Sequence, residues 1–166
     1  MSVKILIQQV ESARLKLPAT GGADDSNEES NVVSIDNGMV VFVCFQQGVT
    51  EEKVTKAAQV VRKVKLSESP DTGSDSKRKT ISQIHGDILV IPQATLGGKL
   101  KGSSIQYHNN IKPSEGEAYY KLFCDQLSQC QEPEGEGVGM VKNGVWGARQ
   151  VLSMDTNGPY SHVFDV

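Results

Sequence analysis

The run MVVFVCF, residues 39–45, is apolar at every position. A strand of this kind has to be buried on both faces, so the run predicts a central strand of a sheet that is covered on both sides. Asn37 and Gly38 stand directly before it, and a second β-branched run, VVSI, occupies residues 32–35. Asn-Gly between two such runs is a strong hairpin signal, because both turn residues tolerate a positive φ. The pattern therefore predicts a β-hairpin around residues 36–38.

Alternation and helical spacing predict further elements on both sides of this run. Apolar residues within 50–66 recur at the i, i+3, i+4, i+7 spacing of a helix with one buried face. The expected elements are strands at 3–10, 13–17, 32–35 and 39–45, a helix at 50–66, a strand at 87–92, a helix at 113–130, and closing strands at 137–141, 150–154 and 160–164. Strands outnumber helices, so we predict one α/β domain over residues 1–166, with two main helices on a mixed or barrel-like sheet. Polar stretches near 18–31 and 67–80 are expected to be flexible loops.

Composition limits the class of protein. The 166 residues carry a formal net charge of −3. This charge excludes a strongly basic protein that coats nucleic acid, but it does not exclude a local basic patch. No apolar run approaches the ~18–20 residues of a membrane span, and the first ten residues lack the pattern of a signal peptide. Three cysteines without CxxC spacing argue against a disulfide framework or a zinc knuckle. We expect a cytoplasmic protein with reduced thiols and no membrane association.

The sequence contains no familiar catalytic motif. His85, His108 and His162 are far apart along the chain, and no G-x-S-x-G elbow is present. Spacings typical of metal ligands, a Walker A loop and a G-x-G-x-x-G loop are also missing. We therefore predict no metal site and no cofactor, and a hydrolase with a Ser–His or Cys–His pair is poorly supported.

Two peptides nevertheless stand out together and in order: Pro92-Gln93-Ala94-Thr95-Leu96 after a buried strand, and Thr156-Asn157-Gly158-Pro159 in a turn. With the opening Gln8-Gln9-Val10, they make the whole chain resemble the D-aminoacyl-tRNA deacylase family, with its DTD-like fold. The family motifs are S-Q-x-T and N-x-G-P. Here Pro92 replaces the Ser, Thr156 replaces the first Asn, and Gln9 replaces an Arg. PQAT with TNGP is most similar to the animal-specific branch, animal tRNA deacylase.

The resemblance implies an activity and a set of site residues. Members hydrolyse the ester between a wrong amino acid and the 3′-terminal adenosine of tRNA, and they act as homodimers in which the Gly-Pro turn of one subunit reaches the pocket of the other. By resemblance, the catalytic residues are Gln93, Ala94 and Thr95. The substrate-binding residues are Pro92, Leu96, Asn157, Gly158, Pro159 and Gln9, and the tRNA-binding residues are Lys99 and Lys101.

The resemblance also implies a mechanism without a side-chain nucleophile. Backbone N–H groups of Ala94 and Thr95 would bind the carbonyl oxygen, and the 2′-hydroxyl of the substrate would help to organise a water molecule. In the animal branch a trans Gly158–Pro159 bond relaxes chiral selection, so that L-alanine mischarged on threonine tRNA becomes a substrate beside D-aminoacyl-tRNAs. In the standard enzymes, the resemblance implies, the Arg at the position of Gln9 supports the cis form of this turn. Gln cannot supply the five-donor charged fork of Arg, so that support is weakened here.

Other interpretations remain open at the level of sequence. Pro92 in place of Ser is compatible with a tRNA-binding module that has lost hydrolysis. A small dimerising scaffold is a third possibility. Gln93 and Thr95 could also be hydrogen-bonding scaffold residues with no part in catalysis.

Overall fold

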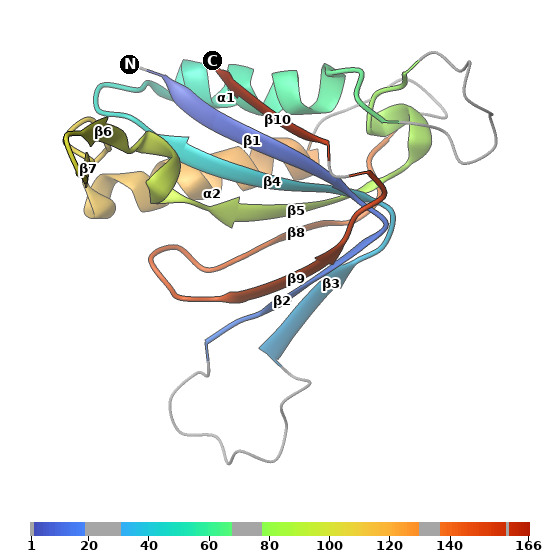
Figure 1. Cartoon of the computed structure of the whole chain (residues 1–166). Coiled ribbons are helices and arrows are strands. Elements are labelled where there is room, and N and C mark those ends of the chain that lie inside the picture. The colour runs from blue at the N-terminus through green and yellow to red at the C-terminus, as the bar shows by residue number, and fades with distance from the viewer. Residues whose placement is uncertain (1, 19–30, 68–77, 130–136, 159) are drawn as a thin grey trace.

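Two bent chain segments pair along their length and set the layout of the protein. In the computed structural model, which describes residues 2–18, 31–67, 78–129, 137–158 and 160–166, β1 (Val3–Val10) runs antiparallel to β4 (Gly38–Phe45). Beyond a bend in each segment, β2 (Ser12–Lys16) runs antiparallel to β3 (Val32–Ile35). Because both segments bend at the same level, one long ribbon contributes strands to two different sheets (Figure 1).

The Asn37–Gly38 hairpin predicted from the sequence is wrong. The strands on its two sides, β3 and β4, belong to different sheets, and neither Asn37 nor Gly38 has a positive φ. Gly38 is required for another reason, since a Cβ at this position would lie 2.0 Å from the carbonyl oxygen of Asp87. The dipeptide therefore marks a close lateral contact between the start of β4 and Asp87, the residue paired with Gly38 on the neighbouring parallel strand.

The larger sheet has five strands in the order β10-β1-β4-β5-β8, with β5 at Asp87–Pro92, β8 at Val141–Asn143 and β10 at Ser161–Asp165. β10, β1 and β4 are antiparallel neighbours, whereas β4, β5 and β8 are parallel. The smaller sheet has the order β3-β2-β9, with β9 at Val151–Asp155. The predicted mixed sheet is confirmed, but in the described part of the chain the strands form open sheets and no closed barrel.

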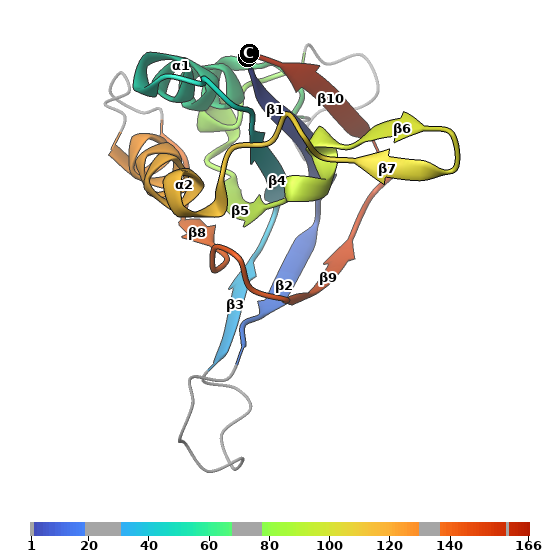
Figure 2. The same ribbon diagram turned by 90° about the vertical axis from the view of Figure 1, so that its left-hand side faces the viewer.

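Both helices cover one face of the larger sheet, and the smaller sheet covers the other face (Figures 1 and 2). α1 (Glu51–Lys63) begins after Thr50, whose side chain accepts a hydrogen bond from Lys53 N, and α2 is Pro113–Gln129. Alternate residues of β4 divide between two cores. Val41 and Val43 pack with the helices, and Val40 packs between the two sheets. The doubly covered central strand predicted from MVVFVCF is thus confirmed.

Most other predicted elements are present, with shifted ends. The helix predicted at 50–66 stops at Lys63, and the strand predicted at 137–141 starts only at Val141. Residues 139 and 140 instead form a loop in which Met140 N donates to a carboxylate oxygen of Asp87 at 2.7 Å. Cys130 and most of the polar stretches at 18–31 and 67–80 lie outside the described residues.

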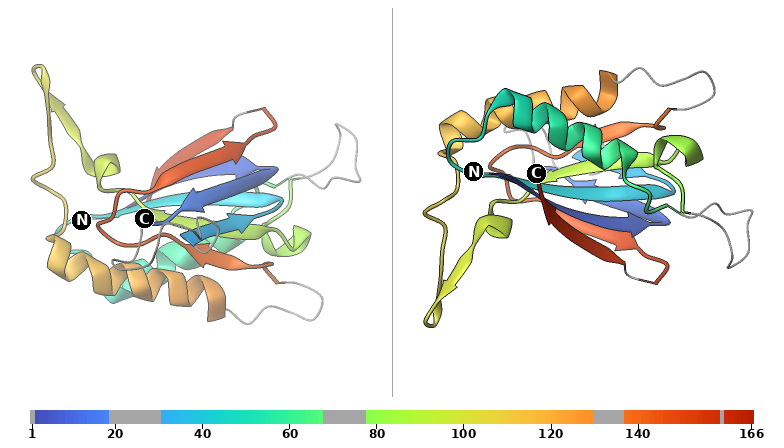
Figure 3. Two further views of the ribbon diagram at one scale, coloured as in Figure 1. Left: turned by 90° about the horizontal axis from the view of Figure 1, so that it is seen from below. Right: turned by 90° about the horizontal axis from the view of Figure 1, so that it is seen from above.

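Four short elements were not predicted. Ser82–Ile84 (η2) and Ala94–Gly97 (η3) are 3₁₀ turns, and β6 (Lys99–Lys101) pairs with β7 (Ser104–Gln106) as a hairpin. This β6–β7 hairpin projects away from both sheets (Figures 2 and 3). The β6–β7 hairpin follows η3 almost directly in the chain, so its position is tied to the end of β5.

Candidate active site

The candidate site lies where β5 ends. Pro92 is paired with Val43 of β4, and Gln93 N donates to Val43 O at 2.8 Å before the chain turns into η3. β4 and β5 are parallel, and ligands of such sheets bind beyond the carboxyl ends of the strands. The fold therefore presents Gln93, Ala94 and Thr95, the three predicted catalytic residues, at an edge suited to a ligand.

Two backbone donors are free at this edge. The N–H groups of Ala94 and Thr95 make no hydrogen bond to any residue in the described part of the chain, and both residues are exposed. The next donors are used, since Leu96 N binds Gln93 O at 3.2 Å and Gly98 N binds Thr95 O at 3.1 Å. The first N–H groups of a helical turn have no partner inside the turn. A pair of such donors can stabilise a negative oxygen that forms during a reaction.

The hydroxyl of Thr95 is held rather than activated. Its Oγ1 accepts a hydrogen bond from Gln93 Nε2 at 2.5 Å. His108 is the histidine that lines the neighbouring pocket, and no hydrogen bond joins its ring to a Ser, Thr or Cys side chain of the described residues. A Thr nucleophile needs a base within reach. The geometry thus provides backbone donors and lacks a nucleophile–base pair at Thr95.

The carbonyl of Ala94 is anchored from behind by residues that sequence reasoning missed. Asn110 Nδ2 donates to Ala94 O at 2.7 Å, and Cys44 Sγ lies 3.6 Å from the same oxygen. Burial raises the pKa of the Cys44 thiol, although a hydrogen bond from the Gly97 backbone acts in the opposite direction. Cys44 is therefore a protonated donor at neutral pH. Asn110 stands 16 positions after Ala94 in a loop, and no motif or periodicity points to it.

A pocket of about 390 Å³ opens beside Ala94. Its wall includes Tyr107, His108 and Trp146. Tyr107 and His108 directly follow the β6–β7 hairpin, whereas Trp146 lies far from it in sequence. Flat aromatic side chains of this kind suit the stacking of a base. The pocket is large enough to hold a small part of a ligand next to the free donors of η3.

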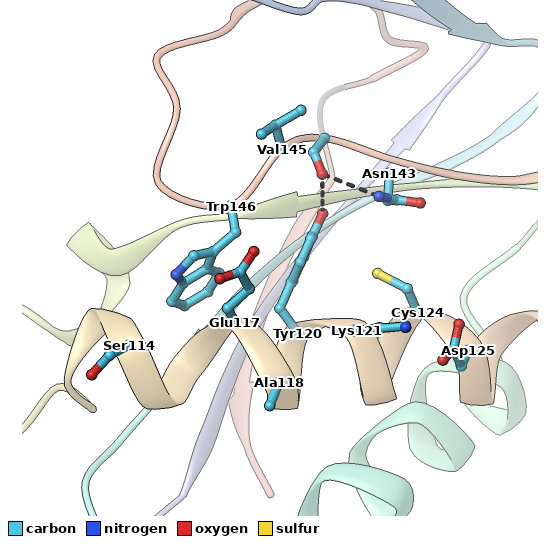
Figure 4. Close-up of a pocket in the computed structure, with 11 residues that line it drawn as sticks. Ser114, Glu117, Ala118, Tyr120, Lys121, Cys124, Asp125, Asn143, Val145 and Trp146 are labelled. Atoms are coloured by element: carbon cyan, nitrogen blue, oxygen red, sulfur yellow. Dashed lines mark hydrogen bonds between the residues drawn. The ribbon is translucent and has the colours of Figure 1, made fainter.

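A second cavity, of about 550 Å³, lies on the other side of Trp146 between α2 and residues 143–146. Figure 4 shows Tyr120 crossing it from the helix toward the 143–146 segment. The Tyr120 hydroxyl lies 3.0 Å from the carbonyl oxygens of both Val90 and Gly144, and burial raises its pKa. Trp146 is fixed by a hydrogen bond from Nε1 to Pro113 O at 3.0 Å. Tyr120 and Trp146 thus act as packed walls.

The turn at residues 156–158, which belongs to the second sequence motif, lies at the end of the larger sheet opposite to η3 (Figure 1). Ser161 is level with Gln8, Val40 and Leu89 across the strands, and the turn at 156–158 lies beyond it, toward the Asp87 end of β5. The two ends of β5 are about 17 Å apart at 3.3 Å per residue. Asn157 and Gly158 are exposed, Gly158 has a φ of 59°, and Pro159 lies outside the described residues. Within one chain, the Gln93–Thr95 segment and the turn do not meet.

The remaining predicted residues fall into two groups. Pro92 and Leu96 are half-buried beside η3, and Lys99 and Lys101 are exposed on β6. Gln9 lies on β1 at the end of the sheet near this turn, but its side-chain amide donates to Leu66 O and no hydrogen bond joins it to residues 156–158. Its neighbour Gln8 instead accepts a hydrogen bond from Ser161 Oγ at 2.5 Å, close to the turn.

Neither a metal site nor a membrane-spanning helix is found among the described residues. No three His, Cys, Asp or Glu side chains among them gather in a way that could hold a metal ion. None of their helices has the length and apolar character of a membrane span.

Comparisons with known proteins agree with this geometry. The family model described as D-Tyr-tRNA(Tyr) deacylase matches residues 6–165. The chain is 37% identical to D-aminoacyl-tRNA deacylase 2 of Danio rerio over 169 aligned residues, covering 99% of both proteins. It is 39% identical to the protein of the same name from Gallus gallus, covering 98% of this chain and 94% of that one.

Solved structures show the same fold. A structure described as a probable eukaryotic D-amino acid tRNA deacylase superposes with a TM-score of 0.79 at 25% identity, over the full length of both chains. The c-Myc DNA unwinding element binding protein superposes with a TM-score of 0.75 over 97% of both chains, and at 22% identity this likeness concerns the fold alone. The chain therefore belongs to the D-aminoacyl-tRNA deacylase family of ester hydrolases, in the branch of the animal D-aminoacyl-tRNA deacylase 2 proteins.

Proposed function

We propose that this protein is a proofreading deacylase that hydrolyses the ester of mischarged tRNA in the cytoplasm. The proposed substrates are L-Ala-tRNA(Thr) and D-aminoacyl-tRNAs. The observation that supports this proposal best is the pair of free N–H groups at Ala94 and Thr95, beside a pocket with aromatic walls. The relatives, which are named D-aminoacyl-tRNA deacylases, support the class of substrate.

In the proposed reaction, water attacks the carbonyl carbon of the ester. The 2′-hydroxyl of the terminal adenosine orients the water, and the proton that the water loses passes to the 3′-oxygen as the ester bond breaks. The Ala94 and Thr95 N–H groups stabilise the oxyanion of the tetrahedral intermediate, and the products are the free amino acid and the 3′-hydroxyl of the tRNA. Gln93 contributes by holding Thr95, as their 2.5 Å hydrogen bond suggests. Pro92 and Leu96 shape the two ends of this loop.

We further propose that Lys99 and Lys101 bind phosphates of the tRNA acceptor end. They lie on one face of the β6–β7 hairpin, opposite Leu100, because side chains alternate along a strand. The hairpin starts immediately after η3, so an RNA strand that places its 3′ end at Ala94 passes close to both lysines. Lysines on such a surface neutralise phosphates without reading sequence.

The active unit in this proposal is a two-fold homodimer. Asn157 and Gly158 lie at the far end of the larger sheet from Ala94, so they can complete a pocket only by reaching into that of another subunit. Exposed apolar side chains at the same end of the chain, Tyr160 at 53% and Val163 at 67%, are compatible with such an interface. An interface between identical patches is the usual arrangement of a two-fold dimer.

Relaxed chiral selection is the finer part of the proposal. We infer a trans Gly158–Pro159 bond, since Gln9 stands where the family has an Arg brace and its amide is engaged with Leu66 O. An X–Pro bond favours trans by only about 0.5–1 kcal/mol, so the loss of a brace is enough to decide the isomer. A trans bond would open the pocket to small L-amino acids.

A deacylation panel tests the proposed function. Catalytic amounts of the protein are mixed separately with L-Ala-tRNA(Thr), a D-aminoacyl-tRNA and correctly charged L-Thr-tRNA(Thr), and released amino acid is measured. We expect turnover of the first two and protection of the third. Tight binding of all three without release would instead identify a tRNA-binding module, and strict release of the D-aminoacyl substrate alone would contradict the trans turn.

A further inference from the structure

Asn110 lies directly behind the peptide that carries one of the proposed catalytic donors. Its Nδ2 donates to Ala94 O at 2.7 Å, which is the shortest of the contacts made by that oxygen with side chains. Ala94 C=O and Thr95 N–H belong to the same peptide unit. In a trans peptide these two groups point in opposite directions. A hydrogen bond that fixes the carbonyl on one side therefore fixes the direction of the Thr95 N–H on the other.

Asn110 is itself rigidly placed. Its backbone N–H donates to Tyr107 O at 3.0 Å, and the next residue, Ile111, donates to Phe45 O at 3.0 Å. Asn110 also forms an isolated bridge with Gln46. These contacts tie the residue to the end of β4, which is the strand that supports Gln93. The anchor and the peptide that it holds thus rest on the same strand.

The other end of the Asn110 side chain has an unusual environment. Its Oδ1 is buried and has no hydrogen-bond partner among the described residues. It packs against Gly97, where a Cβ would lie 1.8 Å from this oxygen. A buried acceptor without a partner is unfavourable and needs an explanation. The orientation that leaves Oδ1 unpaired is the one that places the amide donor on Ala94 O, since Oδ1 could not donate there.

From these contacts we propose that Asn110 is a positioning residue for the Ala94–Thr95 oxyanion site. It orients the Thr95 N–H by holding the Ala94 carbonyl, and it does not touch the substrate ester. A peptide hydrogen-bonded at its carbonyl also becomes a better donor at its N–H. This inference rests on the proposed deacylase function and assigns to it a residue that neither sequence motif contains.

Asn110→Ala provides the first test, with Asn109→Ala as the matched control. Asn109 is the exposed neighbour, and its side chain makes no hydrogen bond to the described residues. In single-turnover deacylation of L-Ala-tRNA(Thr), we expect Asn110→Ala to lower the rate at saturating enzyme by about 10- to 100-fold, the scale of a misplaced catalytic group. The half-saturating enzyme concentration should change less than about twofold, because substrate contacts remain. Asn109→Ala should behave as the wild type.

Asn110→Asp gives a readout that a merely structural role would not produce. When protonated, the carboxyl can donate to Ala94 O; when ionised, it places a negative oxygen against that carbonyl and disturbs the peptide. The ratio of variant rate to wild-type rate should therefore increase as the pH is lowered from about 7.5 to about 5. Because both enzymes act on the same ester, dividing the two rates removes the pH dependence of the ester's own reactivity.

The outcomes separate the two proposals. A wild-type protein that releases no amino acid from any substrate overturns the deacylase function, and this inference with it. An active wild type whose Asn110→Ala rate is unchanged, or changed only through weaker binding, overturns the role of Asn110 alone. If Asn110→Ala fails to fold, the Asp variant decides, and a ratio that does not vary with pH overturns the proposal.

Discussion

At the scale of single residues, the proposed catalytic groups are main-chain donors, and removing one requires a change to the backbone. Ala94→Pro deletes its N–H at the first position of η3, where proline's fixed φ is tolerated. We expect the single-turnover rate to fall by about 10²–10³, the usual loss for one oxyanion donor. Thr95→Ala, which keeps both N–H groups, is the control. Equal rates for Ala94→Pro and the wild type would show that this N–H does not stabilise the oxyanion.

A buried thiol predicts how the fold responds to alkaline pH. Burial raises the pKa of Cys124 from 9.0 to about 12. The thiol pKa is higher in the folded protein than in the unfolded chain. The contribution of the protonated thiol to the free energy of unfolding is therefore fully present below pH 9 and is lost as the pH rises from about 9 toward 12. The loss is roughly 1.4 kcal/mol per pH unit for this group. Denaturant unfolding of wild type and Cys124→Ala at pH 8 and pH 10 should show a smaller pH-dependent loss in the variant; identical losses would contradict the assignment.

The two motif peptides could be recognised from sequence because their residue types are explicit. Gln93 and Thr95 are polar residues at the end of a strong apolar strand, and Gly158 precedes a proline in a turn. Asn110 could not be recognised, because its role comes from a contact across 16 residues of chain with a backbone oxygen. The placement of the Gln9 side chain on Leu66 O was equally hidden, since it depends on where the chain after α1 passes.

At the scale of elements, strands and helices with strong periodicity were predictable and their pairing was not. The apolar run of β4 and the one-sided pattern of α1 specify burial directly. The hairpin prediction failed because Gly38 makes a close contact with Asp87, its partner on the parallel strand β5, and this partner is distant in sequence. The β6–β7 hairpin was missed because its strands are three residues long and almost wholly exposed.

Gly38→Ala tests this account of the contact between Gly38 and Asp87. The added Cβ would lie 2.0 Å from a backbone carbonyl that belongs to β5, an interior strand between β4 and β8, and cannot easily move. We expect a loss of unfolding free energy of about 3 kcal/mol or more, at or above the top of the range for overpacked cores. Gly137→Ala is the matched control, because nothing lies within 4 Å of a Cβ there. Similar melting temperatures for the two variants would refute the explanation.

At the scale of the whole molecule, the separation of the two motifs by the length of β5 makes a shared site between subunits testable. Ala94→Pro damages the pocket, and Gly158→Val damages the turn by placing a β-branched residue at a φ of 59°. In a mixed dimer, one site carries both defects and the other carries neither. Equal mixtures of two inactive variants should thus regain about one quarter of wild-type activity per subunit, if subunits exchange at random.

The control for this mixture is each variant alone at the same total concentration, before and after the unfolding and refolding step that exchanges subunits. Sedimentation should give a dimer mass at micromolar concentration for both. Full activity of a monomer, or no recovered activity in a mixture in which mass analysis detects mixed dimers, would rule out the shared site.

In the proposed mechanism, the substrate's own 2′-hydroxyl and the protein backbone perform the hydrolysis, with no side-chain nucleophile. The most direct test is single-turnover hydrolysis of 3′-linked aminoacyl-tRNA ending in 2′-deoxyadenosine, measured beside the normal substrate with wild type and Thr95→Ala. We predict that the deoxy substrate is hydrolysed about 10²–10⁴ times more slowly by the wild type, the scale of lost acid–base assistance. Thr95→Ala should retain a measurable rate on the normal substrate. Normal cleavage of the deoxy substrate together with an inactive Thr95→Ala would contradict the claim and identify the threonine hydroxyl as the nucleophile.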